Sequence, residues 1–252
     1  MNATGNSQNN IITGNNAANQ LNGDSGNDTL NGGAGDDTLT GWLGADSMLG
    51  GLGNDTYLVE NAGDVVTEIL NQGTDTVSSR LTYTLPINVE NLTLTGTSAV
   101  NGTGNGQNNI ITGNNVANQL NGGAGNDTLN GGAGNDVLNG ETGTNTLTGG
   151  TGNDIFKFTT TAHIDTITDY NVANDTIQLE NAVFTALTTT GTLAFSQFRI
   201  GTQALDANDF IIYNNVTGAL LYDANGNGAG AAVQIATIGV GLAMTNVDIL
   251  VV

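Results

Sequence analysis

Acidic residues recur at every ninth position in two stretches of the chain. The two series are Asp28, Asp37, Asp46 and Asp55, and then Asp127, Asp136 and Asp154, with Asn145 in the remaining position of the second series. Carboxylates supply hard anionic oxygens, and Ca²⁺ takes about six to eight oxygen ligands in proteins. A fold that stacks these aspartates would therefore create a row of cation sites.

Each aspartate lies at the sixth position of a nine-residue unit, Gly-Gly-x-Gly-x-Asp-x-U-x, in which U is a large apolar residue. Residues 32–40 are one copy, and further copies follow in register over residues 23–58 and 122–157. A short fixed period is typical of repeat architectures. The tandem unit resembles the RTX (repeats-in-toxin, hemolysin-type) calcium-binding repeat. This resemblance implies a parallel β-roll that binds several Ca²⁺ ions.

Each unit is predicted to form a six-residue turn and a three-residue strand, with two units in every coil. Residues 18 apart then lie above one another. The glycines allow positive φ angles, so that the turn can direct its carbonyl oxygens inward. The apolar eighth positions should form a narrow core: Leu30, Leu39, Met48 and Tyr57 in the first series, and Leu129, Leu138, Leu147 and Phe156 in the second.

The stacking predicts which sixth-position side chains share an ion. The pairs with two carboxylates are Asp28 with Asp46, Asp37 with Asp55, and Asp136 with Asp154. The pairs with one carboxylate and one amide are Asn10 with Asp28, Asn19 with Asp37, Asn109 with Asp127, Asn118 with Asp136, and Asp127 with Asn145. Asparagine contributes an oxygen without charge, so the mixed sites should be weaker. Stacked carboxylates repel one another without an ion, which makes the metal part of the fold.

Four further aspartates are candidate ligands outside the regular units. Asp64 follows Asp55 by nine residues and continues the register. Asp165, Asp169 and Asp175 lie in a stretch that resembles the segment after the last roll turn of RTX proteins, where the alternative is plain turn formation. The loop that begins at Asp223 opens like an EF-hand but has Gln234 at the twelfth position, so a glycine-rich hairpin loop is favoured there.

The chain is predicted to be all-β, a parallel β-roll or β-helix solenoid in two calcium-binding blocks with a C-terminal β-rich cap. The blocks are residues 1–58 and 101–157, which are related by an offset of 99 residues. Residues 59–100 have short alternating apolar patterns that predict an irregular β-solenoid connector without calcium turns. Residues 158–252 are predicted to be the cap and resemble the C-terminal secretion region of serralysin-like RTX exoproteins.

Composition narrows the range of partners. The 23 acidic residues against three basic ones give a formal charge of −20, which disfavours nucleic acid and anionic membrane. The absence of cysteine excludes disulfides and thiolate metal sites, and no apolar run approaches the ~20 residues of a membrane helix. Residues 1–6 do not form a Sec-type signal. The resemblance instead implies type I secretion from a bacterium to the outside or the cell surface, with residues 247–252 as a candidate export tail.

Catalysis is not expected from these residues. His163 is the one histidine, and neither a His-Glu-x-x-His nor a Gly-x-Ser-x-Gly motif occurs. Two functions remain. One is a secreted calcium-binding structural protein whose chains self-assemble into a surface layer, filament or matrix. The alternative is a non-catalytic C-terminal secretion and folding module of a larger RTX exoenzyme or toxin. Met1 at the start of the chain favours the first, and a cut-out piece of a longer chain would favour the second.

Overall fold

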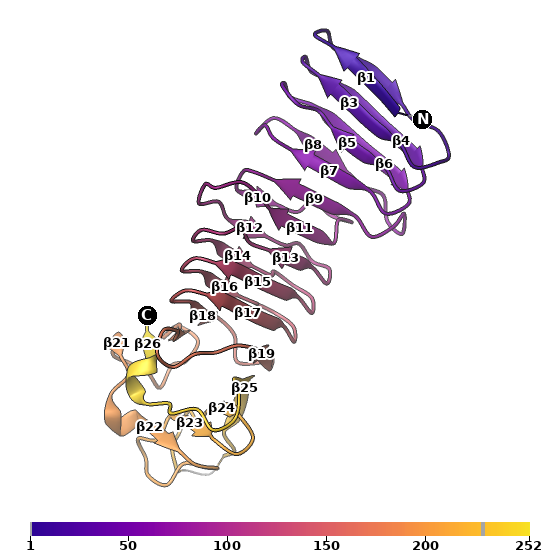
Figure 1. The fold of residues 1–252 in the computed structure, drawn as a ribbon. Coiled ribbons are helices and arrows are strands. Elements are labelled where there is room, and N and C mark those ends of the chain that lie inside the picture. The colour runs from indigo at the N-terminus through magenta and orange to yellow at the C-terminus, as the bar shows by residue number, and fades with distance from the viewer. Residues whose placement is uncertain (1, 228–229) are drawn as a thin grey trace. The chain divides into compact units, whose positions relative to one another are not determined.

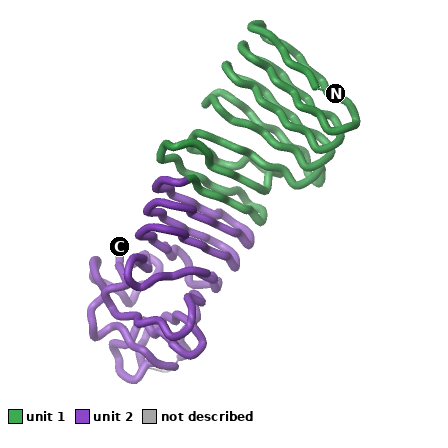
Figure 2. Tube along the Cα trace, viewed as in Figure 1, with its two compact units in different colours: residues 1–114 green, residues 115–252 purple. Residues whose placement is uncertain are grey.

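The structure is a computed structural model that describes residues 2–227 and 230–252. The chain divides into two compact units, residues 1–114 and residues 115–252 (Figure 2). The described residues form β-strands and two short 3-10 helices, η1 (Phe195–Gln197) and η2 (Asn246–Asp248), and no α-helix. None of the helices in the described part has the length and apolar character needed to cross a membrane. The predicted all-β fold is confirmed.

The first unit is a stack of parallel β-coils (Figure 1). Its strands are β1 (Asn2–Asn6), β2 (Ile11–Thr13), β3 (Gln20–Asp24), β4 (Thr29–Ala34), β5 (Thr38–Thr40), β6 (Ser47–Leu52), β7 (Thr56–Val59), β8 (Val65–Thr67), β9 (Thr76–Ser79), β10 (Tyr83–Thr84), β11 (Asn91–Leu94), β12 (Gly102–Thr103) and β13 (Ile110–Thr112). The odd-numbered strands of this unit pair in the order β1-β3-β5-β7-β9-β11-β13. The even-numbered strands pair as β2-β4-β6-β8 and, separately, as β10-β12.

The register of the regular coils follows the nine-residue unit. Leu21 lies opposite Leu39, and Leu39 lies opposite Tyr57, so residues 18 apart are neighbours in the same sheet. On the other side of the coil Leu30 lies opposite Met48. Because strand side chains alternate between the two faces of a sheet, this register directs every eighth-position side chain inward. Each of these side chains is at most 1% exposed.

Parallel pairing continues through residues 59–100 on one sheet. Tyr57 pairs with Val77, Val77 with Leu92, and Leu92 with Ile111, although the sequence steps between them are no longer 18 residues. The longer and shorter steps are absorbed in the loops, while the strands keep a buried apolar column. The predicted division of the chain into residues 1–58, 59–100, 101–157 and 158–252 stays a prediction.

The second unit begins with the same coil and ends in a β-rich cap. Its strands are β14 (Gln119–Asn121), β15 (Thr128–Ala133), β16 (Val137–Asn139), β17 (Thr146–Thr151), β18 (Ile155–Phe158), β19 (Asp165–Ile167), β20 (Thr176–Leu179), β21 (Gly191–Thr192), β22 (Phe198–Ile200), β23 (Ile211–Asn214), β24 (Ala219–Tyr222), β25 (Val233–Thr237) and β26 (Ile249–Val251). Leu129 lies opposite Leu147, and Leu138 opposite Phe156, again 18 residues apart.

Two late strands close the end of this roll. β25 adds in parallel to β19, and β26 adds in parallel to β20, so each sheet of the roll is extended by a strand from the cap. β23 and β24 form an antiparallel hairpin in the cap. The cap has its own core, in which Phe184 packs edge-on against Tyr222 with ring centroids 5.1 Å apart.

Candidate metal centre

The six-residue turns require glycine for two reasons. Some turn positions have positive φ angles, and at others a Cβ atom would clash with neighbouring oxygen atoms. Gly33 and Gly35 have φ angles of 104° and 101°, the left-handed region that other residues rarely adopt. At the preceding position, a Cβ on Gly32 would lie 2.3 Å from Oδ2 of Asp37 and 2.6 Å from the carbonyl oxygen of Gly50. The turn therefore gathers a carboxylate oxygen and a carbonyl oxygen of the next coil around one glycine.

The sixth-position side chains form columns that we call acid ladders. The first unit has two ladders, A and B. Ladder B consists of Asn19, Asp37, Asp55, Asp75 and Glu90, and the backbone N–H of each of the first four donates to the carboxylate one coil further on. The N to O distances are 2.6 Å from Asn19 to Asp37, 2.7 Å from Asp37 to Asp55, 2.8 Å from Asp55 to Asp75, and 2.8 Å from Asp75 to Glu90. The ladder thus extends beyond the regular repeats, through Asp75 and Glu90.

Ladder A occupies the opposite side of the first unit. Asn10 donates to Asp28 and Asp28 to Asp46, each over 2.7 Å, and Asp46 donates to Oδ1 of Asp64 over 3.3 Å. Asp64 therefore lies in the register that the sequence predicts. Its second oxygen, Oδ2, accepts the backbone N–H groups of Glu60 and Asn61. Asp64 ends the ladder as the cap of a turn.

Ladder C, in the second unit, has the same bonds. Asn118 donates to Asp136 over 2.7 Å, Asp136 to Asp154 over 2.9 Å, and Asp154 to Asp175 over 3.1 Å. Oδ2 of Asp175 accepts the N–H of Asn171 at 2.8 Å, so this carboxylate also caps a turn.

Ladder D completes the second unit. Asp127 donates to Oδ1 of Asn145 over 2.8 Å, and Asn145 donates to Oδ1 of Asp165 from both its backbone nitrogen and its side-chain amide. Asp169 lies outside the ladders and accepts the N–H groups of Gly149 and Gly150 at 2.9 and 2.8 Å. These bonds give Asp169 a turn-forming role, and metal binding by Asp165, Asp169 and Asp175 stays a prediction.

The asparagines at sixth positions use their side chains locally. Oδ1 of Asn10 accepts the N–H of Asn6, and Oδ1 of Asn19 accepts the N–H of Asn15, each at 2.7 Å. Oδ1 of Asn109 accepts the N–H of Asn105 at 2.7 Å. Asn109 and Asp127 belong to different units, and their pairing stays a prediction.

One oxygen of six regular ladder aspartates is buried without a hydrogen-bond partner. These six atoms are Oδ2 of Asp28, Asp37, Asp46, Asp55, Asp136 and Asp154. Each of these residues is at most 2% exposed. A buried charged oxygen without a donor is strongly unfavourable, so a native fold normally gives it a partner. The donor set consists of hard carboxylate oxygens, which fits Ca²⁺.

Burial and repulsion between neighbouring carboxylates disfavour the charged form of the ladder aspartates, and a bound cation would offset both effects. Burial raises the pKa of Asp55 and of Asp136 to about 6, and the neighbouring carboxylates of Asp75 and Asp154 add to the respective shifts. Burial likewise raises the pKa of Asp37. The three basic side chains of the chain are engaged in ion pairs with other acids: Arg80 with Glu60, Lys157 with Glu180, and Arg199 with Asp209.

Sequence reasoning missed Asp75 and Glu90 because they break the nine-residue register. A second signal could have found them. Each lies two residues before a buried apolar strand residue, Val77 and Leu92, just as Asp55 lies two residues before Tyr57. The acid-x-apolar pattern therefore follows the ladder where the glycine pattern does not.

The fold and the ladders together define a calcium-binding β-roll. The RTX calcium-binding nonapeptide repeat family matches the chain in four copies, over residues 2–30, 22–57, 103–138 and 121–156. The chain therefore carries RTX repeats, and Ca²⁺ is the ion that these repeats bind. The matches leave residues 58–102 and 157–252 outside the repeat family.

Two solved structures are similar to the chain at low identity. The solution structure of the AlgE6R3 subunit from the Azotobacter vinelandii mannuronan C5-epimerase is 21% identical, with a TM-score of 0.36, and covers 57% of this chain and 78% of that chain. The extracellular lipase LipA from Serratia marcescens is 19% identical, with a TM-score of 0.28, and covers 99% of this chain and 41% of that chain. No curated protein matches the chain.

Proposed function

We propose that the protein is an extracellular calcium-responsive structural protein whose rolls fold when Ca²⁺ fills the acid ladders. The observation that supports this most directly is the set of six buried Oδ2 atoms without partners. A chain with these atoms unneutralised is unstable at the low calcium concentration of a cell interior. The higher calcium concentration outside the cell then provides the signal to fold.

Calcium-dependent folding can be tested by circular dichroism of the purified chain. We expect mostly unfolded chain with excess chelator and recovery of β signal on addition of calcium. Magnesium at equal concentration is the control for charge screening, because Mg²⁺ demands a smaller octahedral site and retains its waters. Equal β signal in chelator and in calcium would contradict the proposal.

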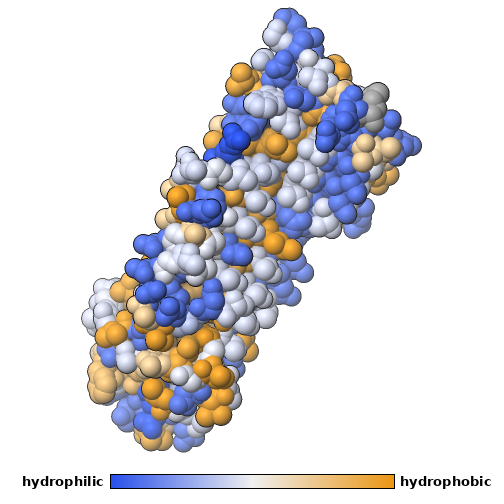
Figure 3. Space-filling view, viewed as in Figure 1, coloured by the Kyte–Doolittle hydropathy of each residue, from blue (hydrophilic) through white to orange (hydrophobic). Residues whose placement is uncertain are grey.

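We further propose that the calcium-loaded chains associate with one another. Each calcium ion adds two positive charges, so about five filled sites remove half of the formal charge of −20 that keeps chains apart. The second unit also exposes large apolar side chains on its cap, including Phe195 at 84% and Val216 at 79% exposure. Apolar colour is visible over the cap in Figure 3. Exposed apolar groups on a less charged chain favour association.

Light scattering with and without calcium measures this association. Particle growth that depends on calcium and on protein concentration supports a structural assembly. A strictly monomeric calcium-loaded chain would instead favour a secretion and folding module of a larger exoprotein.

Export is a separate part of the proposal. Deletion of the cap, residues 158–252, should retain the chain in a bacterium that carries a type I exporter. Continued export of the truncated chain would remove that part.

A further inference from the structure

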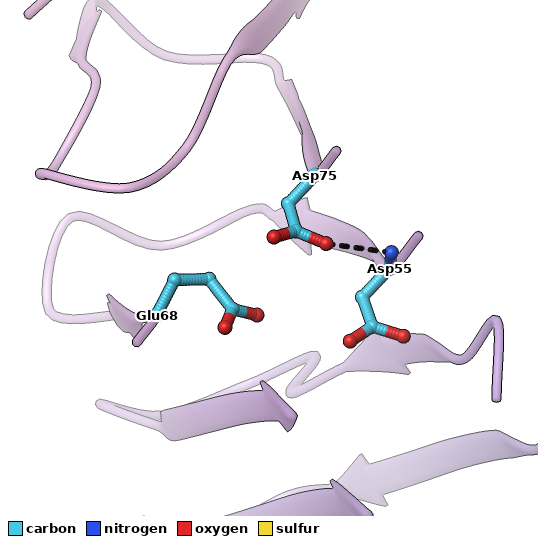
Figure 4. A group of neighbouring side chains, drawn as sticks. All are labelled: Asp55, Glu68 and Asp75. Carbon is cyan, nitrogen blue, oxygen red and sulfur yellow. Dashed lines mark hydrogen bonds between the residues drawn. The ribbon is translucent and has the colours of Figure 1, made fainter. Parts of the chain in front are cut away.

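Three buried carboxylates meet where the first roll passes into residues 59–100. Asp55 precedes β7, Glu68 follows β8, and Asp75 precedes β9. One carboxylate oxygen of each lies within 4.8 Å of those of the other two. In Figure 4 the carboxylate of Glu68 points toward those of Asp55 and Asp75. Asp55 and Asp75 are 1% exposed and Glu68 is 5% exposed.

Neighbouring donors hold the three carboxylates and leave one fully buried oxygen without a donor. Oδ1 of Asp55 accepts the N–H of Asp37, and Oδ1 of Asp75 accepts the N–H of Asp55. Glu68 accepts the hydroxyl hydrogen of Tyr57 and the N–H of Ile69. The remaining oxygen of Asp55, Oδ2, is buried and has no partner. The geometry is therefore held by the backbone and by Tyr57, while the charge is not neutralised.

No basic side chain balances this cluster. The nearest in sequence, Arg80, forms its ion pair with Glu60 at 3.5 Å, and the other two basic residues of the chain pair with acids of the second unit. Three buried carboxylates at this spacing require a cation if they are ionised together. The donors are all oxygen atoms in a nearly dry site, which suits Ca²⁺ better than Mg²⁺.

The end of the second roll supplies a comparison inside the same chain. Phe156 occupies the position of Tyr57 in the 99-residue duplication, and Asp154 donates to Asp175 as Asp55 does to Asp75. Phe156 has no hydroxyl group, and its ring instead contacts the ring of Tyr170 at a centroid distance of 5.9 Å. Among the described residues, the cluster at Asp55 is the one group of three acids close enough to share an ion.

We propose that Asp55, Glu68 and Asp75 form a three-carboxylate calcium site, in which Asp55 and Asp75 belong to ladder B and Glu68 joins them from outside the ladder. Two of its three carboxylates come from the segment that was expected to lack calcium turns. The site ties the loop between β8 and β9 to the last regular turn of the first roll. Tyr57 is a positioning residue that orients Glu68. The proposal rests on the proposed calcium-dependent function and adds to it a three-carboxylate site.

Glu68→Gln tests the site because it removes one charge and keeps the size of the side chain. The matched control is Glu60→Gln, a carboxylate of the same segment that pairs with Arg80. We expect calorimetric calcium titration of Glu68→Gln to show one site fewer, or one site weakened by about tenfold or more, because ligand charge sets calcium affinity. Glu60→Gln should bind as the unchanged chain does.

Terbium, which replaces calcium at oxygen sites and emits when a nearby tyrosine is excited, gives a second readout. We expect Tyr57→Phe and Glu68→Gln each to lose the same part of the tyrosine-sensitised emission, and Glu60→Gln to keep it. Tyr57→Phe retains the buried ring, so it keeps the test decisive even if Glu68→Gln folds poorly.

Two results would overturn the proposal. One is calcium number and affinity in Glu68→Gln equal to those of Glu60→Gln. The other is unchanged terbium emission in Tyr57→Phe. If either occurs while the unchanged chain binds several calcium ions, the proposed function stands and this site alone is refuted. An unchanged chain that binds no calcium refutes both.

Discussion

The Asp136→Asn substitution should change the stability of the protein in opposite directions with and without calcium. Asp136 is fully buried; its Oδ1 accepts the N–H of Asn118, and its Oδ2 has no partner. Asparagine keeps the acceptor oxygen and places an N–H donor where Oδ2 stands. The chain already contains this arrangement at Asn145, whose amide donates to Asp165 at 2.9 Å and to the carbonyl oxygen of Gly143 at 3.3 Å.

The magnitude follows from the ladder. Asp136 and Asp154 lie on successive coils, and neighbouring strands are ~4.8 Å apart. Two unit charges at that distance and an effective dielectric constant of ~20 repel by ~3.5 kcal/mol, before relaxation of the side chains. Removing one charge should therefore stabilise the calcium-free fold by about 2 to 3 kcal/mol. With calcium at about 100 times its dissociation constant, each lost site removes about 2.7 kcal/mol of binding-linked stability. Asp136 belongs to two of the predicted pairs, with Asn118 and with Asp154, so the substitution removes about 5.4 kcal/mol. This loss exceeds the gain from the removed repulsion, and the calcium-loaded form should be destabilised by about 2 to 3 kcal/mol.

Urea unfolding followed by circular dichroism, in chelator and in excess calcium, measures both effects. Glu141→Gln is the matched control, since it removes one charge from a half-exposed side chain outside the ladders. We expect this control to change stability little in either condition. If Asp136→Asn were destabilising in chelator as well as in calcium, the Asp136 carboxylate would stabilise the calcium-free protein. The interpretation of Oδ2 as a calcium ligand would then be wrong.

Two further predictions concern backbone strain and pH. Glu141 has a φ of 61° at a repeat position where glycine is the usual residue, so Glu141→Gly should raise the stability of the calcium-loaded form by about 1 kcal/mol; a lower thermal midpoint would contradict this. Because burial raises the pKa of Asp55 and of Asp136 to about 6, above the ordinary value of 3.8, their protonated forms favour the folded state. The stability of the calcium-free protein should therefore be greatest below pH 4 and fall as the pH rises through about 6, and a stability in chelator that rises over this range would refute the assignment.

The local repeat determined most of the roll. A glycine at a fixed turn position, an apolar residue two places after each aspartate and a period of nine together predict two strands per coil and the 18-residue register that pairs Leu21 with Leu39. These features follow from short-range backbone geometry and from alternation along a strand, which the sequence displays directly. The same period identified the six aspartates whose Oδ2 atoms are buried without partners.

Long-range packing decided the rest. β25 and β26 extend the two sheets of the second roll. Their pairing depends on contacts between segments about 70 residues apart, and no local sequence period predicts such contacts. Glu68 meets Asp55 because an irregular loop returns to the last turn, and Tyr57 holds it there through a hydroxyl group that replaces the usual leucine methyls. A sequence pattern specifies which side chains face inward along a strand. Only the folded chain specifies which loops bring their charges to the same point.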